Sequence, residues 1–284
     1  MIFFTKTMIY IALLLSILSG CGFSQKEENE SKEYDMKNPD KFNMPESLFE
    51  ISGIAFNKGE SDTVYAIQDE EGKLFRLAWD VKLQRHTKFG KKGDYEDVSV
   101  LRDTAIILKS NGSLYVFPLA EAQFEEVTDV LEIKKILPKG EYEGMYGDEE
   151  SGNLFVICKN CPQDDSKNSV SGFIVNPNDS TRTIGHFSIN VKEIKAITGK
   201  VERGFRPSAL AKNPVTGEWY IISAVNKLLV VTDSKWKVKN AFPLSSNTFT
   251  QPEGLAFDKA GNMYISDEGD DLADGNIMKF SRKK

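Results

Sequence analysis

The chain has few of the residues that common hydrolases depend on. Only two histidines occur, His86 and His186. A Ser–His–Asp triad or a histidine-dependent lactonase mechanism therefore has few candidate residues. No Gly-x-Ser-x-Gly elbow and no phosphate-binding loop is present in the sequence. We therefore predict no catalytic residue from any of these motifs.

The chain also lacks an excess of positive charge and a long apolar run. The net charge is −6, and no basic stripe is present. Such a chain repels phosphate backbones, which argues against nucleic acid as a partner. The apolar run Met8–Leu18 is too short to span a bilayer comfortably. Sustained helical periodicity is absent, except that Val127–Ile136 fits a helix and an outer strand equally well.

The chain contains three cysteines, two of them in the motif Cys158-x-x-Cys161. A redox role would need a helix start after a βαβ unit, and the surrounding sequence does not have that pattern. A zinc site would need a second pair of ligands, which the sequence does not offer. In an oxidising compartment the motif predicts a local disulfide between Cys158 and Cys161.

The N-terminus has the features of a bacterial lipoprotein signal. Lys6 precedes the apolar run, which ends in the lipobox Leu18-Ser19-Gly20-Cys21. This pattern predicts a signal peptide at 1–20 and lipidation of Cys21 with acyl chains such as palmitate. Each buried methylene contributes about 0.8 kcal/mol to membrane attachment, so two or more chains hold firmly. The alternative is an uncleaved anchor with an incidental cysteine.

Residues 21–44 are rich in Glu, Lys, Asn and Ser, which predicts a disordered acidic tether. The cluster at 26–30 resembles the acidic export signals that direct some lipoproteins to the cell surface; the alternative is a plain solvated linker. We expect a membrane-attached protein of the cell envelope, either periplasmic or surface-exposed.

Residues 45–284 contain five copies of one pattern, in which an acidic or hydroxyl residue and a small residue precede an apolar one. About a dozen residues later an apolar strand follows, and the copies are about 45 residues apart, with one longer step. This repeat predicts an all-β domain, a five-bladed β-propeller with blades of four antiparallel strands. The copies begin at Ser52, Glu96, Glu143, Ser208 and Glu253.

The chain ends soon after the third strand of copy five, at Phe280. A segment within Lys37–Phe49 is therefore expected to supply the fourth strand of that blade and to close the ring. The longer step, Asn160–Arg203, is expected to contain an extended loop and an insertion.

Three of these motifs carry a resemblance to a known family. They are Ser52-Gly53-Ile54-Ala55, Glu143-Gly144-Met145 and Gln251-Pro252-Glu253-Gly254-Leu255, the last followed by Gly261-Asn262-Met263-Tyr264-Ile265-Ser266. Together they resemble the SdiA-regulated (YjiK-type) family across nearly all of Leu48–Phe280. The resemblance implies a five-bladed propeller distantly related to NHL-repeat propellers, an envelope location and a calcium site. Asp97 and Ala209 depart from the family's usual glycine.

Equivalent positions of successive blades form a ring at one end of the channel. The first ring contains Ser52, Glu96, Glu143, Ser208 and Glu253, and a second ring would contain Asp69, Ser110, Lys159, Ala224 and Glu268. Two carboxylates about 6 Å apart repel by about 3 kcal/mol at an effective dielectric near 20. Calcium suits such oxygen ligands best. We predict a calcium site formed by Glu96, Glu143, Glu253, Ser52, Ser208, Asp69 and Glu268. The alternative is a water-filled channel in which each glutamate bonds backbone amides.

Two classes of function remain open at this point. The first is a monomeric, non-catalytic envelope module that binds a small molecule or a partner protein and is rigidified by calcium. The second is a calcium-dependent hydrolase of phosphoesters or lactones, in which the metal activates water. The shortage of general bases near the ring favours the binding module.

Overall fold

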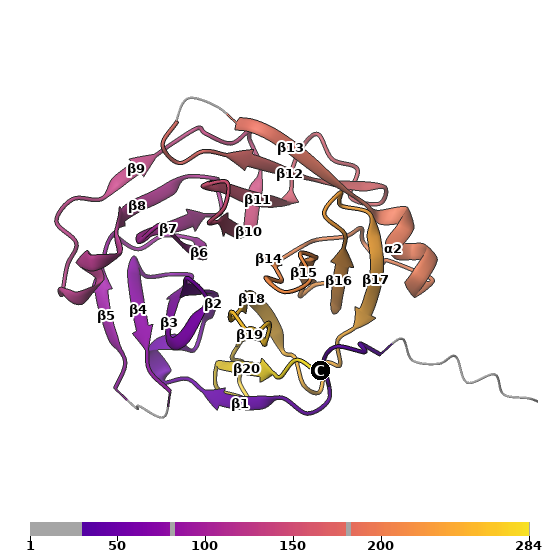
Figure 1. Ribbon diagram of the computed structural model, residues 1–284, viewed down its shortest axis with the longest axis horizontal. Coiled ribbons are helices and arrows are strands. Elements are labelled where there is room, and N and C mark those ends of the chain that lie inside the picture. Colours follow the sequence, from indigo (N-terminus) through magenta and orange to yellow (C-terminus); the bar gives the residue numbers. More distant parts are fainter. Residues whose placement is uncertain (1–29, 80–82, 180–182, 284) are drawn as a thin grey trace, which may run out of the picture.

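The computed structural model describes residues 30–79, 83–179 and 183–283. The signal peptide at 1–20 and Cys21 lie outside these residues. The described residues form five four-stranded antiparallel sheets arranged around a central axis (Figure 1). This arrangement confirms the all-β, five-bladed propeller predicted from the repeats.

Each blade begins with a strand beside the axis and proceeds outward. Blade one contains β2 (Ile51–Asn57), β3 (Glu60–Gln68), β4 (Lys73–Leu77) and β5 (Arg85–Lys88), and blade two contains β6 (Tyr95–Leu101), β7 (Thr104–Lys109), β8 (Leu114–Pro118) and β9 (Leu131–Ile133). Blade three contains β10 (Glu141–Asp148), β11 (Asn153–Asn160), β12 (Ser169–Val175) and β13 (Thr183–Asn190), and blade four contains β14 (Ala209–Lys212), β15 (Trp219–Ser223), β16 (Leu228–Thr232) and β17 (Val238–Pro243). Blade five contains β18 (Gln251–Phe257), β19 (Met263–Glu268) and β20 (Asn276–Phe280).

The ring closes as expected. Strand β1 (Asp40–Asn43) pairs antiparallel with β20 and completes blade five, with Phe42 opposite Ile277. These backbone hydrogen bonds cover the edge of β20, and β1 becomes the outermost strand of blade five.

The folded part of the chain begins earlier than the composition predicts. Tyr34 is buried, donates a hydrogen bond from its hydroxyl to the carbonyl of Gly261, and accepts one from Asn213. Residues 30–44 are therefore ordered, and the predicted tether at 21–44 extends too far. The polar composition of this stretch concealed one buried aromatic residue.

Small residues let the five innermost strands approach one another closely. A Cβ atom on Gly144 would lie 2.8 Å from the backbone nitrogen of Leu210 in the next blade, and one on Gly53 would collide with Asp97. Asp97 itself is buried, and its carboxylate accepts hydrogen bonds from the backbone amides of Val98 (2.8 Å) and Met145 (2.6 Å). The departure from glycine thus adds a link between blades two and three, and the strand keeps the register shift that blades three and five have at the equivalent glycine.

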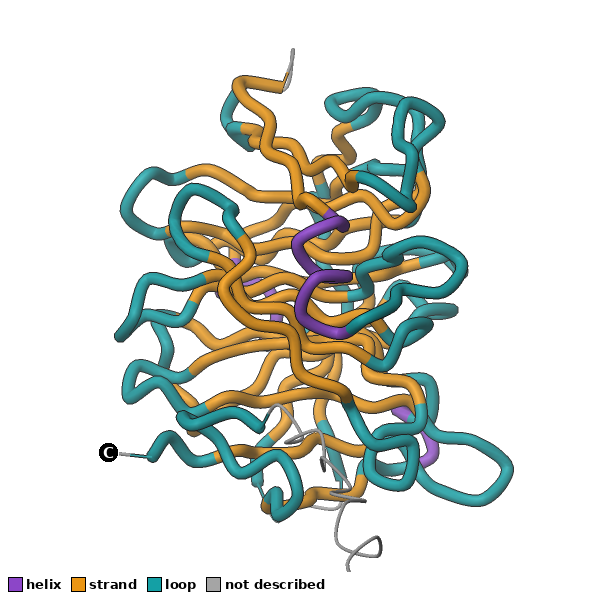
Figure 2. Tube along the Cα trace, turned by 90° about the vertical axis from the view of Figure 1, so that its right-hand side faces the viewer, coloured by secondary structure: helices purple, strands orange, loops and turns teal. Residues whose placement is uncertain are grey.

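The longer third step contains regular structure. It contributes β12 and β13, followed by helix α2 (Val191–Thr198). Asn190 caps the start of this helix by accepting a hydrogen bond from Lys192, and Gly199 ends it at a φ of 84°. Figure 2, at right angles to Figure 1, shows α2 on the outer rim, with loops gathered on both faces of the ring. The predicted insertion is therefore mostly the outer half of blade three, and the helix that directly follows β13 was not predicted.

Apart from α2, the described helical segments are two short 3-10 turns, η1 (Glu46–Leu48) and η2 (Leu119–Gln123). In the part of the chain that the structure describes, no helix has the length and apolar character needed to cross a bilayer. The ambiguous stretch at 127–136 contains β9, so the outer-strand interpretation was correct.

Candidate functional site

One end of the central channel opens into a polar cavity of about 240 Å³. The innermost strands begin at this end, and the cavity is lined by the residues that enter them. Eight acidic side chains and a single basic one take part. The lining consists of Glu50, Ser52, Asp69, Asp94, Glu96, Ser110, Glu141, Glu143, Lys159, Gln251, Glu253 and Glu268. We call this cavity the acidic mouth.

Six of the seven predicted ligands line the acidic mouth: Ser52, Asp69, Glu96, Glu143, Glu253 and Glu268. Ser208 does not line it. Its hydroxyl donates to the carbonyl of Pro252 (2.8 Å) and accepts from the amide of Ala224 (3.2 Å). Ser52 likewise donates to the carbonyl of Glu96 (2.6 Å). Both serines thus join neighbouring blades, and blade four contributes no side chain to the cavity.

Four further side chains in the lining were not predicted. Glu50, Asp94, Glu141 and Gln251 each stand two positions before a motif residue that lines the mouth. Side chains two positions apart in a strand point to the same side. The period of two was the signal that would have identified them.

Lys159 is the positive counterpart of this cavity. Its ammonium forms an ion pair with Glu143 and lies 4.0 Å from Glu141. Burial alone would lower the pKa of Lys159, but the adjacent Glu143 outweighs burial, and the pKa is raised overall. The lysine therefore stays charged and offsets only part of the negative charge.

The carboxyl groups of the mouth hold their protons more tightly than usual. Burial, reinforced by the neighbouring Glu143, raises the pKa of Glu96 to about 8. Burial and nearby acids also raise the pKa of Glu268 to about 7 and that of Asp69 to about 6. The pKa values of Glu143 and Glu253 rise for the same reason, against the opposing effect of Lys159. At neutral pH the mouth therefore favours an added positive charge.

One oxygen in the mouth has no hydrogen-bond partner although it is buried. The side chain of Glu143 is 5% exposed; one of its oxygens bonds Lys159, and Oε2 has no partner. A buried carboxylate oxygen without a donor is costly, and a cation would satisfy it. The available donors are carboxylate, hydroxyl and amide oxygens, the ligand types that calcium prefers.

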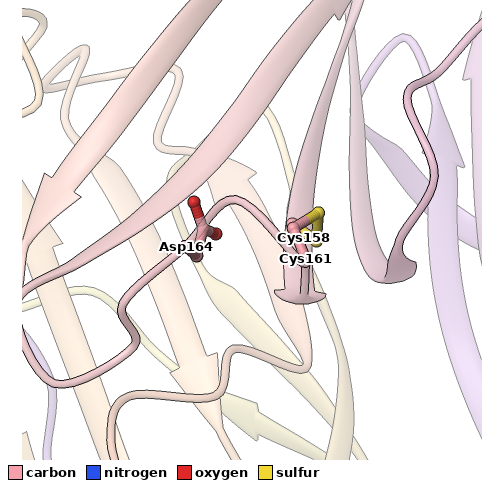
Figure 3. Close-up of side chains that lie close together, drawn as sticks. All are labelled: Cys158, Cys161 and Asp164. Carbon is pink, nitrogen blue, oxygen red and sulfur yellow. A yellow bond between two sulfur atoms is a disulfide. The ribbon is translucent and has the colours of Figure 1, made fainter.

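The carboxylates are not drawn together into a closed cluster. Among the described residues, the only three His, Cys, Asp or Glu side chains whose ligand atoms lie within 4.8 Å of one another are Cys158, Cys161 and Asp164. The two cysteines form a disulfide, with Cα atoms 6.0 Å apart, where β11 ends (Figure 3). Asp164 accepts hydrogen bonds from the amide and hydroxyl of Ser171. This triplet is therefore a structural feature of the loop.

The histidines lie far out in their blades. His86 is on β5 and His186 is on β13, each the outermost strand of its sheet. Neither lines the acidic mouth. The sequence had placed both outside the motif strands, and their outer positions leave the mouth without an imidazole base.

A family model described as SdiA-regulated matches residues 31–271 of the chain. The chain belongs to the SdiA-regulated family. A comparison with curated protein sequences gives no significant match. The family match begins at residue 31 and thus includes the buried Tyr34.

Several solved structures share the fold of this SdiA-regulated protein at low sequence identity. The glutaminyl cyclase of Myxococcus xanthus has a TM-score of 0.55 and 14% identity, covering 86% of this chain and 96% of its own. A luciferin-regenerating enzyme has a TM-score of 0.54 and 9% identity, covering 86% and 95%. The PQQ-bound aldose sugar dehydrogenase of Streptomyces coelicolor has a TM-score of 0.53 and 9% identity, covering 87% and 99%. At these identities the likeness concerns the fold alone.

Proposed function

We propose that this SdiA-regulated protein is a lipid-anchored module of the bacterial cell envelope whose acidic mouth binds calcium. The observation that carries the proposal is the imbalance of the mouth, where eight acidic side chains face one lysine and a buried Glu143 oxygen has no partner. In the calcium-bound form, Glu96, Glu143 and Glu253 would supply ligand oxygens, and Asp69 and Glu268 would supply charge from the second ring. The cation would fasten blades two, three and five to one another at the axis.

The expected affinity is weak. Among the described residues, no three carboxylates have oxygen atoms within 4.8 Å of one another. Calcium must therefore draw the carboxylates together, which costs free energy. Flexible oxygen sites of extracellular modules have dissociation constants on the order of 10⁻⁴–10⁻³ M. Such a site would be filled at the calcium concentrations found outside cells. The propeller so rigidified would act as a binding module for a small molecule or an envelope partner.

The hydrolase alternative is not favoured. Metal-assisted hydrolysis needs a group that accepts a proton from the attacking water. The lining of the mouth offers no imidazole, and its remaining candidate bases are the carboxylates that the proposed calcium would use as ligands.

Calorimetric titration with calcium chloride tests the cation site. We expect millimolar binding to the wild type and at least about tenfold weaker binding to Glu143→Gln. Binding should be unchanged in Asp271→Asn, which alters an exposed acidic loop at 270–274 outside the mouth. The absence of heat, or an equal loss in both variants, would reject the calcium site.

The lipid anchor is tested separately. Metabolic labelling with radioactive palmitate should mark the wild type and not Cys21→Ser, and the variant should leave the membrane fraction. Labelling that persists in Cys21→Ser would exclude this cysteine as the attachment point. Protease digestion of intact cells would then distinguish a surface location from a periplasmic one.

A further inference from the structure

The opposite end of the same channel has a second cavity, of about 520 Å³. It is lined by residues near the C-terminal ends of all five innermost strands, whereas the acidic mouth is lined at their N-terminal ends. Its walls are mostly apolar and include Ile54, Ala55, Phe56, Val98, Val100, Met145, Tyr146, Leu255, Ala256 and Phe257. We call it the apolar mouth.

The apolar mouth is open to water and has a buried floor. The lysines at its entrance, Lys58 and Lys259, have side chains that are 56% and 67% exposed. Val98 in its lining is 1% exposed. Small-molecule clefts have volumes of roughly 300–1,000 Å³ and mostly apolar walls with a few polar groups, and this cavity fits that description. An open apolar cavity at the axis of a propeller is a candidate binding site.

Three ammonium groups and one carboxylate border this cavity. They belong to Lys58, Lys212, Lys259 and Glu149. Each lysine has an acidic partner, at 2.9 Å (Asp103), 3.3 Å (Asp148) and 2.6 Å (Glu60) respectively. None of these three partners lines the cavity. The pairs of Lys58 and Lys259 are exposed, and such pairs contribute little to stability, so the lysines can exchange partners at low cost.

We propose that the apolar mouth binds a small amphipathic carboxylate of the medium-chain fatty-acid type. The alkyl chain would occupy the hollow between the innermost strands, and the carboxylate would lie among the ammonium groups at the entrance. Charge decides the class once the lysines exchange their acidic partners for a ligand: the cavity itself is bordered by three ammonium groups and one carboxylate, which favours an acid over an amine. The apolar walls favour an alkyl chain over a sugar or nucleotide. This inference is independent of the calcium site at the other end.

Displacement of the fluorescent fatty acid dansylaminoundecanoate from the full-length protein tests the proposal, in the presence of a chelator so that calcium soaps do not form. Decanoate should displace the probe, decanol should do so at least about tenfold less well, and decylammonium should be weakest. In the double variant Lys58→Met, Lys259→Met, decanoate should displace the probe no better than decanol does. The matched control Lys134→Met, Lys200→Met removes two exposed, ion-paired lysines outside the cavity and should change nothing.

A second variant tests the location. Pro214 lines the cavity from an exposed turn, so Pro214→Trp should fill the entrance without altering the core. The variant should lose binding of the probe while keeping the thermal unfolding temperature of the wild type. Equal displacement by decanoate and decanol would overturn the carboxylate class. Absent probe binding, or binding that Pro214→Trp leaves intact, would overturn the site itself.

Discussion

The two mouths lie at opposite ends of the innermost strands of the propeller, yet their surfaces are opposite in character. At the N-terminal ends, Glu96 and Glu143 face a cavity with eight acids. Four residues further along the same strands, Val100 and Gly147 face an apolar cavity rimmed by lysines. The fold supplies two sites on one axis, and the residues placed at each end give them different chemistry.

The comparison also separates two kinds of ion pair. Lys159 is held among carboxylates in a largely buried cavity, with its side chain 23% exposed, and its partner Glu143 is 5% exposed. Lys58 and Lys259 form their pairs in contact with water. Charges in a buried site interact strongly and are costly to leave unpaired, whereas exposed pairs are screened. The acidic mouth should therefore respond to charge changes far more than the apolar mouth.

The largest expected effect follows removal of the charge of Lys159. Lys159→Met should lower the free energy of unfolding by about 2–3 kcal/mol without calcium, because it leaves the buried Glu143 carboxylate unpaired. With saturating calcium most of this loss should be recovered, and calcium affinity should rise at least about tenfold, because the metal no longer competes with an ammonium. Urea unfolding with and without calcium measures both.

The matched control for this variant is Lys212→Met at the apolar mouth. The Lys212 side chain is 28% exposed and also forms a single close ion pair. The decrease in the free energy of unfolding of Lys212→Met should be the same with and without calcium. A calcium-independent loss in Lys159→Met would show that this lysine is only a structural partner of Glu143.

The next effect is a decline of stability with rising pH in the calcium-free protein. The pKa of Asp69 is raised to about 6, that of Glu268 to about 7 and that of Glu96 to about 8. The folded state therefore binds these protons more tightly than the unfolded state. The resulting stability is fully present below about pH 4 and is lost as the pH rises from about 4 to 8, last of all for Glu96. Each group contributes up to about 1.4 kcal/mol per pH unit.

Thermal unfolding measured across this pH range checks the slope. Calcium should flatten it, and Glu96→Gln should reduce it, because the amide cannot ionise. Stability that stays constant or increases from pH 6 to 8 would contradict the proposed excess of negative charge at the acidic mouth.

A smaller effect is expected from the serine that links blades four and five. Ser208→Ala should cost about 1–2 kcal/mol, because it leaves a buried carbonyl and a buried amide without a partner. Calcium affinity should stay the same, since Ser208 does not line the mouth. Calorimetry showing a loss of calcium binding comparable to that of Glu143→Gln would restore Ser208 as a ligand.

The smallest effect belongs to the exposed lysines of the apolar mouth. Lys58→Met and Lys259→Met should each change the free energy of unfolding by less than about 0.5 kcal/mol, because exposed ion pairs contribute little. Calcium affinity should not change either. A large loss of stability would mean that these lysines hold the turns between strands and are unavailable to a ligand.

Repetition in the sequence was sufficient to predict the ring, its closure by an N-terminal strand and the gathering of the three motif glutamates. These features depend on spacing and on the small residues beside the motif positions, both of which a sequence displays directly. Helix α2 was missed because it spans only eight residues and buries few apolar side chains, which is too little for a periodic pattern.

The parts of the site that were missed depend on three-dimensional contacts. Ser208 occupies the equivalent position of its blade but directs its hydroxyl to the next blade. The spacing of the repeats does not predict this orientation. Lys159 was placed in the second ring, but its ion pair with Glu143 requires side chains from adjacent strands, β10 and β11. The apolar mouth combines residues from five repeats that look individually like core positions.

The most direct test of the central claim is a crystal structure of the calcium-soaked protein with an anomalous difference map. The account predicts one peak on the axis between Glu96, Glu143 and Glu253, with the ammonium of Lys159 moved away from Glu143. An empty acidic mouth, with these side chains arranged as in the calcium-free protein and the cation on the exposed loop at 270–274, would contradict it.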